Sequence, residues 1–356
     1  MLVLCDLLSN YYYYRGALAF LCSLFIMLLC GNKVIELLQK LSFGQVVRNC
    51  GPESHLSKQG TPTMGGVLLI SAIVASVLLF CNLKDANVWI ALFAVVTHAL
   101  IGFADDFLKI VRKNPNGLIA KWKYFWQSVC AIAISASLIY FNPDASSVFN
   151  LPFYGVVLIP FMPLVITFFL GYFVTVGSSN AVNLTDGLDG LAAGVTIIVS
   201  IALAIAIVCC IEPSSVSHMH LVELEKISSA REMFVTCAAI TGACTGFMWF
   251  NSYPARVFMG DVGALALGAI LGVISLIVKL EFFLFIIGGI YVLETVSVIL
   301  QVGSYKLRNG KRIFKMAPIH HHFEKSGWHE TTVVNRFIII TVILAFIGIA
   351  SLLKLW

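Results

Sequence analysis

Charged side chains are scarce in this sequence. Only 12% of its 356 residues are Asp, Glu, Lys or Arg, whereas 59% are hydrophobic. A soluble domain carries roughly 25% charged residues and needs them to cover its apolar core. The composition therefore excludes a large soluble core and predicts a polytopic membrane protein.

The sequence also lacks Cys-x-x-Cys pairs, and we do not expect a cleavable signal. The ten cysteines include no Cys-x-x-Cys pair, and most, such as Cys130 and Cys237, lie within apolar runs. Such cysteines are typical of small buried side chains and do not indicate a disulfide or zinc framework. The first apolar run, 18–30, lacks an Ala-x-Ala cleavage site, so we expect it to be the first membrane span.

The apolar segments predict about ten membrane spans, each of which needs roughly 20 residues. They are 18–38, 64–83, 88–108, 124–141, 154–176, 188–211, 234–250, 262–278, 282–302 and 337–353. Several prolines interrupt the fourth and fifth segments, but Pro is tolerated where neighbouring groups satisfy the freed carbonyls. We predict an all-α polytopic fold in which residues 1–356 form a single membrane-embedded domain.

Basic residues orient these spans. The net charge of +5 is typical of Lys and Arg enrichment in cytoplasmic loops and not of a nucleic-acid partner. The loops after odd-numbered spans hold most of the Lys and Arg, which predicts that both termini are extracytoplasmic. The polar motifs then fall on the cytoplasmic face, namely Asp105-Asp106, Asp186, Asp189, Asp261 and His320 to His322.

The polar stretch from Asn180 to Gly190 lies between two apolar runs. A helix N-cap would explain one or two of its side chains, but not the whole set that includes Asn183, Asp186 and Asp189. Either the stretch is a buried cap between helices, or it binds a polar ligand at the membrane surface. We favour the ligand site, because we expect it to open the sixth span and a helix N-terminus attracts anions.

Two further acidic positions lie in similar surroundings. Asp105 and Asp106 end the third predicted span, where the helix dipole disfavours negative charge. Adjacent helical residues point about 100° apart. We therefore expect one of these two carboxylates to face the reacting groups and the other to orient the first carboxylate or a neighbouring side chain. Asp261 precedes the eighth span. As a third acid on one face it suggests a divalent cation such as Mg²⁺, which takes hard oxygen ligands and phosphate oxygens.

Three other features are individually weaker. His320, His321 and His322 could bind zinc, but zinc sites need further ligands at set spacing, so we favour donors to a phosphate or sugar. Lys58 precedes a Gly- and Thr-rich run that could pack helices or reach phosphate. Glu294 lies inside the ninth span, where an acid is either functional or paired with a neighbouring polar group.

Carboxylates, lysines and histidines gathered on one membrane face favour phosphoryl transfer, in which the protein positions groups and stabilises charge. The membrane location indicates that one substrate is a lipid phosphate. A transporter is the alternative of a different class. Transporters, however, place ionisable sites near the bilayer midplane between repeats, and this chain shows no internal repeat.

Five motifs, in their order along the chain, resemble the polyprenyl-phosphate N-acetylhexosamine-1-phosphate transferases. They are Gly60-Thr-Pro-Thr-Met-Gly-Gly66, Asp105-Asp106, Asn183-Leu-Thr-Asp-Gly-Leu-Asp-Gly190, Phe258-Met-Gly-Asp261 and Pro318-Ile-His-His-His-Phe-Glu324. The resemblance covers essentially the whole chain, and the triple histidine points to the muramoyl-pentapeptide branch of the family. It implies a multi-pass protein of the bacterial cytoplasmic membrane, often a homodimer, with its active site facing the cytoplasm.

The resemblance also implies a reaction. Phospho-N-acetylmuramoyl-pentapeptide would pass from its UDP-linked donor to undecaprenyl phosphate, with Mg²⁺ as cofactor, to give lipid I and UMP. The transfer would take place either by direct attack of the lipid phosphate or in two steps through an aspartyl intermediate. The related transfer of N-acetylglucosamine 1-phosphate is the alternative within the family.

The resemblance carries roles over to individual residues. Asp261 would be the Mg²⁺ ligand, and Asp105 would act on the lipid phosphate with support from Asp106. The implied nucleotide contacts are Asn183, Asp186, Asp189, Asn251 and Phe258. The implied phosphate or sugar contacts are Lys58, which would also serve catalysis, and Lys113, Lys121, His320, His321 and His322.

Overall fold

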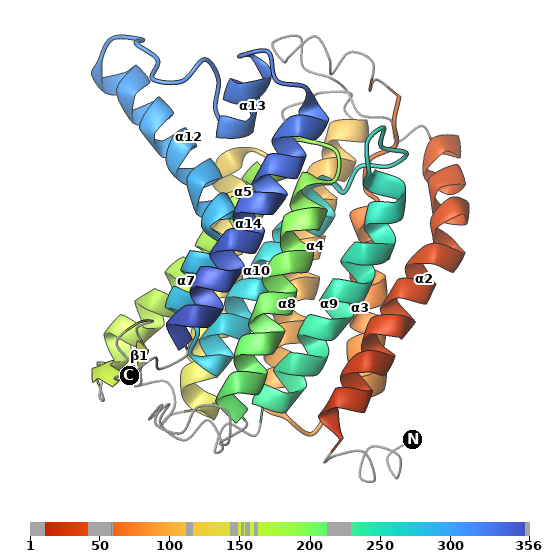
Figure 1. Ribbon diagram of the computed structural model, residues 1–356, viewed down its shortest axis with the longest axis vertical. Helices are drawn as coiled ribbons and strands as arrows, with labels where there is room; N and C mark the ends of the chain where they lie inside the picture. The colour runs from red at the N-terminus through yellow and green to blue at the C-terminus, as the bar shows by residue number, and fades with distance from the viewer. Residues whose placement is uncertain are drawn as a thin grey trace.

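The structure is a computed structural model that describes residues 11–41, 58, 60–111, 117–142, 149–150, 153, 157–159, 163–211 and 229–352. Long helices run side by side and form a bundle (Figure 1). The elements in chain order are α2 (Tyr12–Lys40), α3 (Gly66–Phe80), α4 (Ala86–Val111), α5 (Ala120–Phe141), β1 (Phe149–Asn150), β2 (Val157–Ile159), α7 (Leu164–Thr185), α8 (Leu191–Ile211), α9 (Ala230–Asn251), α10 (Gly260–Val278), α11 (Glu281–Ile287), α12 (Gly289–Leu307), α13 (Ile319–Glu324) and α14 (Glu330–Leu352).

The helices have the length and composition of membrane spans. Within the described residues, 8 helices are long and apolar enough to cross a membrane, or up to 9 if α11 and α12 are one bent span. Apolar chains are helical in lipid because the backbone N–H and C=O groups find partners only within the segment. Large apolar side chains such as Leu29 and Phe346 are exposed on the helices. The chain is therefore a multi-pass membrane protein, as its composition predicts.

Helix α10 lies at the centre of the bundle. In its most apolar window 94% of the residues are buried, compared with 28% for α2 and for α5. It packs chiefly against α4 and α7, while α9 packs against α2 and α8. Any polar group at an end of α10 is therefore surrounded by the ends of several other helices.

The two ends of the bundle differ in composition. We call the end near α13 the acidic end, because Asp105, Asp106 and Asp261 lie there, and the other the opposite end. Helix α2 begins at the opposite end and α14 ends there, so the start of the first described helix and the end of the last lie on the same side of the bundle (Figure 1). Which end faces the cytoplasm stays a prediction.

The fifth predicted span, 154–176, is wrong in its position. The helix in this region is α7, which begins after Pro163 and continues to Thr185. Residues 157–159 form strand β2, which pairs with β1 in an antiparallel ladder. A short apolar run does not by itself distinguish a strand from a helix, and the proline at the N-cap marks the true start of the helix.

This shift also corrects the location of the Asn183-to-Gly190 stretch. It does not simply open the sixth span, because Asn183 lies in the last turn of α7 and Asp186 follows that helix. Helix α8 begins only at Leu191. The stretch therefore joins a helix C-terminus to a helix N-terminus, and we call residues 183–190 the α7–α8 link.

The ninth predicted span, 282–302, is broken. Helices α11 and α12 meet at Gly288 with a bend of 80°. The backbone angles of Gly288 are ordinary, but a Cβ atom there would crowd the Leu284 carbonyl, so the small residue permits the close approach at the bend. As a result α12 leans away from the bundle (Figure 1), and α13 contacts both α12 and α14.

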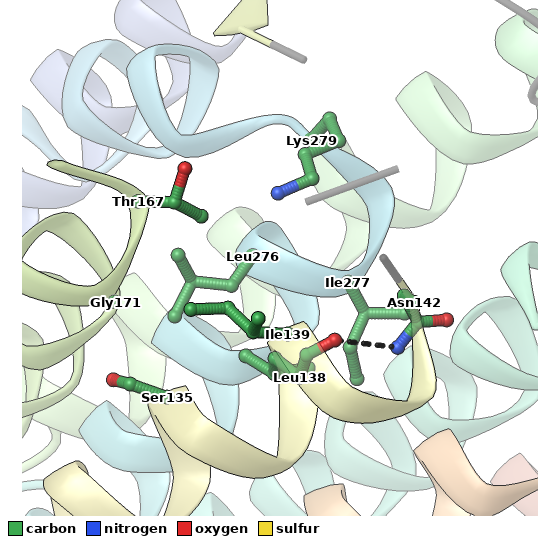
Figure 2. Close-up of a pocket in the computed structure, with 9 residues that line it drawn as sticks. All are labelled: Ser135, Leu138, Ile139, Asn142, Thr167, Gly171, Leu276, Ile277 and Lys279. Atoms are coloured by element: carbon green, nitrogen blue, oxygen red, sulfur yellow. Dashed lines mark hydrogen bonds between the residues drawn. The ribbon is translucent and has the colours of Figure 1, made fainter. Parts of the chain in front are cut away.

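A small cavity lies at the opposite end, between α5, α7 and the end of α10. Figure 2 shows Lys279 and Thr167 on one side of it and apolar side chains such as Leu276 on the other. Lys279 follows the last residue of α10, whereas Asp261 is in its first turn. The 19 residues of α10 separate the two by about 28 Å at 1.5 Å per residue, so this cavity is distinct from the acidic motifs.

Candidate functional site

Three aspartates from two helices meet at the acidic end. Asp105 and Asp106 lie near the end of α4 and are both 3% exposed, and Asp261 lies in the first turn of α10. One carboxylate oxygen of each lies within 4.8 Å of the other two. Among the described residues, this is the one group of acids, histidines or cysteines close enough to share a metal ion.

A glycine allows the two helices to come this close. Gly102 lies one turn before Asp105 and Asp106 on α4, and a Cβ atom there would overlap the backbone of Asp261. The backbone N–H of Val262, one of the unsatisfied donors at the start of α10, donates to Oδ2 of Asp106 at 3.3 Å. The small side chain thus permits the packing that brings the acids together.

Two lysines lie among these carboxylates. Lys109 Nζ lies 2.7 Å from Oδ2 of Asp105, 3.4 Å from Oδ1 of Asp106 and 3.0 Å from Oδ2 of Asp261. Lys123 Nζ, from α5, lies 2.8 Å from the same Asp261 oxygen. Two ammonium groups are therefore shared by three carboxyl groups, so the lysines do not match the acids one to one.

The α7–α8 link closes one side of this cluster. Asn183 Nδ2 donates to Oδ1 of Asp261 at 2.7 Å. Although Asp186 is partly exposed, desolvation of its carboxyl, together with the nearby charges of Asp261 and Asp106, raises the pKa of Asp186 to about 8. A carboxyl that resists ionisation is the expected response to an uncompensated cluster of negative charge.

A second ionic cluster lies beside the link. Lys58 Nζ lies 2.6 Å from Oδ1 of Asp189 and 2.5 Å from Oε1 of Glu330, the first residue of α14. Glu330 Oε1 also accepts a hydrogen bond of 2.7 Å from the Asp189 N–H. Lys58 Nζ lies 6.0 Å from the centre of the Phe258 ring. Phe258, a predicted nucleotide contact, therefore lies beside this cluster.

Asn251 has a supporting position. Its Oδ1 accepts a hydrogen bond from the Gly190 N–H at 3.0 Å, and its Nδ2 donates to the Val257 carbonyl at 2.9 Å. Asp189 Oδ2 accepts from the Ala255 N–H at 3.0 Å. Both polar side chains therefore join the α7–α8 link to the loop between α9 and α10.

The three histidines have separate partners. His320 is buried beside Glu294 of α12, and His321 Nδ1 lies 2.7 Å from Oε2 of Glu324. His322 Nδ1 accepts a hydrogen bond from the Lys315 N–H at 3.1 Å. They do not converge on one point, which disfavours a shared zinc ion.

The structure separates the predicted lysines. Lys58 lies in the ionic cluster described above, Lys121 is exposed at the start of α5, and Lys113 lies outside the described residues. The sequence reasoning did not assign roles to Lys109, Lys123 or Glu330. The sequence could have indicated Lys109, since it lies three and four residues after the two aspartates and such residues face each other on a helix. The contacts of Lys123 and Glu330 are long-range, so no local sequence pattern indicates them.

The arrangement suits anionic ligands and a hard cation. Carboxylate oxygens from separate helices are the ligand type that Mg²⁺ takes, and the donor set of Asp105, Asp106 and Asp261 fits it by chemistry and spacing. Lysines beside the cluster can contact phosphate oxygens. A cation held here, together with these lysines, would neutralise two phosphate groups brought together at the membrane surface.

Comparison with known families agrees with this chemistry. Residues 88–279, more than half of the chain, match the family described as glycosyl transferase family 4, and this match includes all three aspartates and the α7–α8 link. Residues 58–70, which begin at Lys58, match phospho-N-acetylmuramoyl-pentapeptide-transferase signature 1. The chain therefore belongs to glycosyl transferase family 4, the polyprenyl-phosphate hexosamine-1-phosphate transferases, and carries the signature of its phospho-N-acetylmuramoyl-pentapeptide-transferases.

Proposed function

We propose that this membrane phosphosugar transferase moves phospho-N-acetylmuramoyl-pentapeptide from its UDP-linked donor to undecaprenyl phosphate, giving lipid I and UMP. The observation that carries the proposal is the cluster of Asp105, Asp106 and Asp261 with Lys109 and Lys123 at one end of a membrane bundle. The signature at residues 58–70 supports the muramoyl-pentapeptide donor.

In the proposed reaction, an oxygen of the lipid phosphate attacks the β-phosphorus of the UDP-linked donor. The new P–O bond forms as the bond to the UMP oxygen breaks. Asp105 aligns or deprotonates the lipid phosphate, and Asp106 supports it through Lys109 and the Val262 N–H. Lys109 and Lys123 counter the repulsion between phosphates, which is strong at short range.

We further propose Mg²⁺ as the cofactor, held by Asp261 with Asp105 and Asp106 nearby. When bound, the ion would neutralise phosphate oxygens and stabilise charge on the departing UMP. The α7–α8 link, through Asn183, Asp186 and Asp189, forms the nucleotide wall with Asn251 and Phe258. Lys58, Lys113, Lys121 and the three histidines contribute phosphate and sugar contacts.

The remaining proposals concern the setting of the enzyme. The acidic end faces the cytoplasm of a bacterium, where a UDP-linked donor is supplied, and both termini lie outside the inner membrane. The full chain acts as one membrane-embedded domain. A homodimer is the expected assembly, which cross-linking in native membranes would test.

One assay tests the proposed function. Purified protein in detergent is given undecaprenyl phosphate and either UDP-N-acetylmuramoyl-pentapeptide or UDP-N-acetylglucosamine, with Mg²⁺ or with a chelator. We expect UMP release only with the pentapeptide donor and Mg²⁺. Release from UDP-N-acetylglucosamine would indicate the other branch of the family, and donor binding without UMP release would indicate a transporter.

A further inference from the structure

Glu294 and His320 form a pair in the interior of the protein. Glu294 lies within α12, His320 lies on α13, and neither residue is exposed. Nδ1 of His320 is 3.0 Å from Oε1 of Glu294. Within the described part of the chain, neither the Glu294 oxygens nor the His320 nitrogens have a partner with hydrogen-bond geometry. Each group therefore faces the other, and the ring of His321 packs against His320 with the ring centres 4.1 Å apart.

Burial limits the charge states of this pair. An ionised carboxylate without solvent or a compensating charge costs several kcal/mol. The pair is consequently most stable when its net charge is zero. Two states meet this condition: a carboxylate beside a doubly protonated imidazolium, or a carboxylic acid beside a neutral imidazole.

Both states place a hydrogen on the far nitrogen, Nε2. The imidazolium carries hydrogens on both nitrogens. In the neutral pair the acidic hydrogen of Glu294 faces Nδ1, 3.0 Å away, so the single ring hydrogen lies on Nε2. Either neutral arrangement leaves one buried donor without an acceptor among the described residues. This arrangement leaves the imidazole N–H unpaired, whereas the reverse one would leave the stronger donor, the carboxylic O–H, unpaired, which costs more in the interior.

The Nε2 edge of His320 is directed at the α7–α8 link. A Cβ atom on Gly187 would overlap Nε2 and Cε1 of His320, so the imidazole lies directly against this backbone. Gly187 itself is partly exposed, and the neighbouring Asp186 is too. One layer of backbone therefore separates Nε2 from the outer surface of the proposed nucleotide wall.

From these contacts we infer that Glu294 is a positioning residue for the transfer reaction and that it acts through His320. It keeps Nε2 of His320 protonated and pressed against Gly187, where a shift of the link on substrate binding presents an N–H donor to a phosphate or sugar oxygen of the donor. This role rests on the proposed function, since it assigns the recipient of the hydrogen bond to the UDP-linked substrate. The bend between α11 and α12 brings Glu294 to this place.

The protonation of Nε2 can be measured without any substrate. Protein labelled with ¹⁵N-histidine in nanodiscs gives one Nε2 resonance for each of the 8 histidines, and His320→Gln identifies the one that belongs to His320. We expect this Nε2 to resonate in the protonated range at neutral pH, and Glu294→Ala to change its shift. An unprotonated Nε2 in the wild-type protein would overturn the inference.

A double-mutant cycle tests the action through His320. Glu294→Ala and His320→Ala should each weaken binding of UDP-N-acetylmuramoyl-pentapeptide by about tenfold or more, as expected for loss of a hydrogen bond to a charged group. The double variant should bind no more weakly than His320→Ala alone. Independent, additive losses would mean that Glu294 does not act through His320. Glu294→Gln, which preserves size, covers the case in which the alanine variant does not fold.

Glu281→Ala provides the matched control. It removes another buried glutamate, on α11 at the opposite end, and should leave both the His320 resonance and donor binding unchanged. The two proposals fail separately. Wild-type protein that does not release UMP would contradict the proposed function while the nitrogen shift still decides the state of His320. Active protein with an unprotonated Nε2 would remove this inference alone.

Discussion

Buried charged side chains are paired differently at the two ends of the bundle. At the opposite end, Arg15 of α2 and Glu232 of α9 form a two-pronged ion pair with N···O distances of 2.8 and 2.7 Å. The backbone N–H of Asn82 donates to Glu232, and the carbonyl of Phe80 accepts from Arg15. At the acidic end, three carboxylates share two lysines, and the Lys109 side chain is 31% exposed.

The difference separates a structural ion pair from a binding site. Arg15 and Glu232 are matched one to one and enclosed, and their ion pair joins α2 to α9. The aspartates of the acidic end repel one another at 4.8 Å or less, which opposes folding. Such an arrangement is retained where a ligand completes it, and a cation or a lysine-bound phosphate would do so.

The largest expected effect follows from removing one member of the unbalanced cluster. Asp261→Asn should lower UMP release by roughly 10³-fold, because a metal supplies several kcal/mol of charge stabilisation and each tenfold corresponds to about 1.4 kcal/mol. The fold should remain intact, since the amide is isosteric and lies at the mouth of the bundle. Asp85→Asn at the opposite end is the matched control and should retain full turnover. Wild-type rates in Asp261→Asn would remove the metal role.

Breaking the Arg15–Glu232 ion pair should lower stability and leave turnover unchanged. Arg15→Met leaves Glu232 buried without its cation, which should lower the free energy of unfolding by about 3 kcal/mol. Turnover per folded molecule should stay at the wild-type level, because the acids lie at the other end of the bundle. Thermal unfolding in detergent, followed beside UMP release, measures both. The double variant Arg15→Met, Glu232→Gln should recover part of the stability; a loss of turnover without a loss of stability would contradict the comparison.

Much of the fold could be read from composition. Scarce charge and long apolar runs predicted a polytopic helical membrane protein, and every predicted span has a helical counterpart. The fifth and ninth spans were wrong in position and in continuity. Both errors have a local physical cause. Pro163 starts α7 later than the apolar run does, and the chain bends at Gly288, which hydropathy does not register.

The candidate site could be predicted only in part. The resemblance and the loop charges identified Asp105, Asp106 and Asp261 as members of one face, and the structure brings them together. Their cations could not be found in the same way. Lys123 and Lys121 are both basic residues in the first turns of α5, and only the packing of α5 against α4 and α7 decides which one faces Asp261.

Substitution of Lys123 or Lys121 should have a smaller effect on turnover than substitution of Asp261. Lys123→Ala should lower turnover by about tenfold to hundredfold, since it removes a charge-assisted contact worth roughly 1.5–3 kcal/mol. Lys121→Ala is the natural control on the same helix and should cost less, because its side chain is exposed. Steady-state UMP release at saturating donor compares them. A larger loss for Lys121 would show that substrate contacts outweigh the ion pairs of the structure.

The last prediction concerns the pH dependence of stability. The pKa of Asp186 is raised from 3.8 to about 8, so between these values the folded protein holds a proton that the unfolded chain has lost. The free energy of unfolding therefore falls as pH rises through this window. Asp186→Asn should flatten the fall, and melting temperatures from pH 5 to 9 in a chelator, for wild type and variant, would measure it. Mg²⁺ should reduce the difference, because a cation beside Asp261 offsets the charge that raises this pKa. An equal slope in wild type and variant would mean that the carboxyl is already compensated within the acidic end.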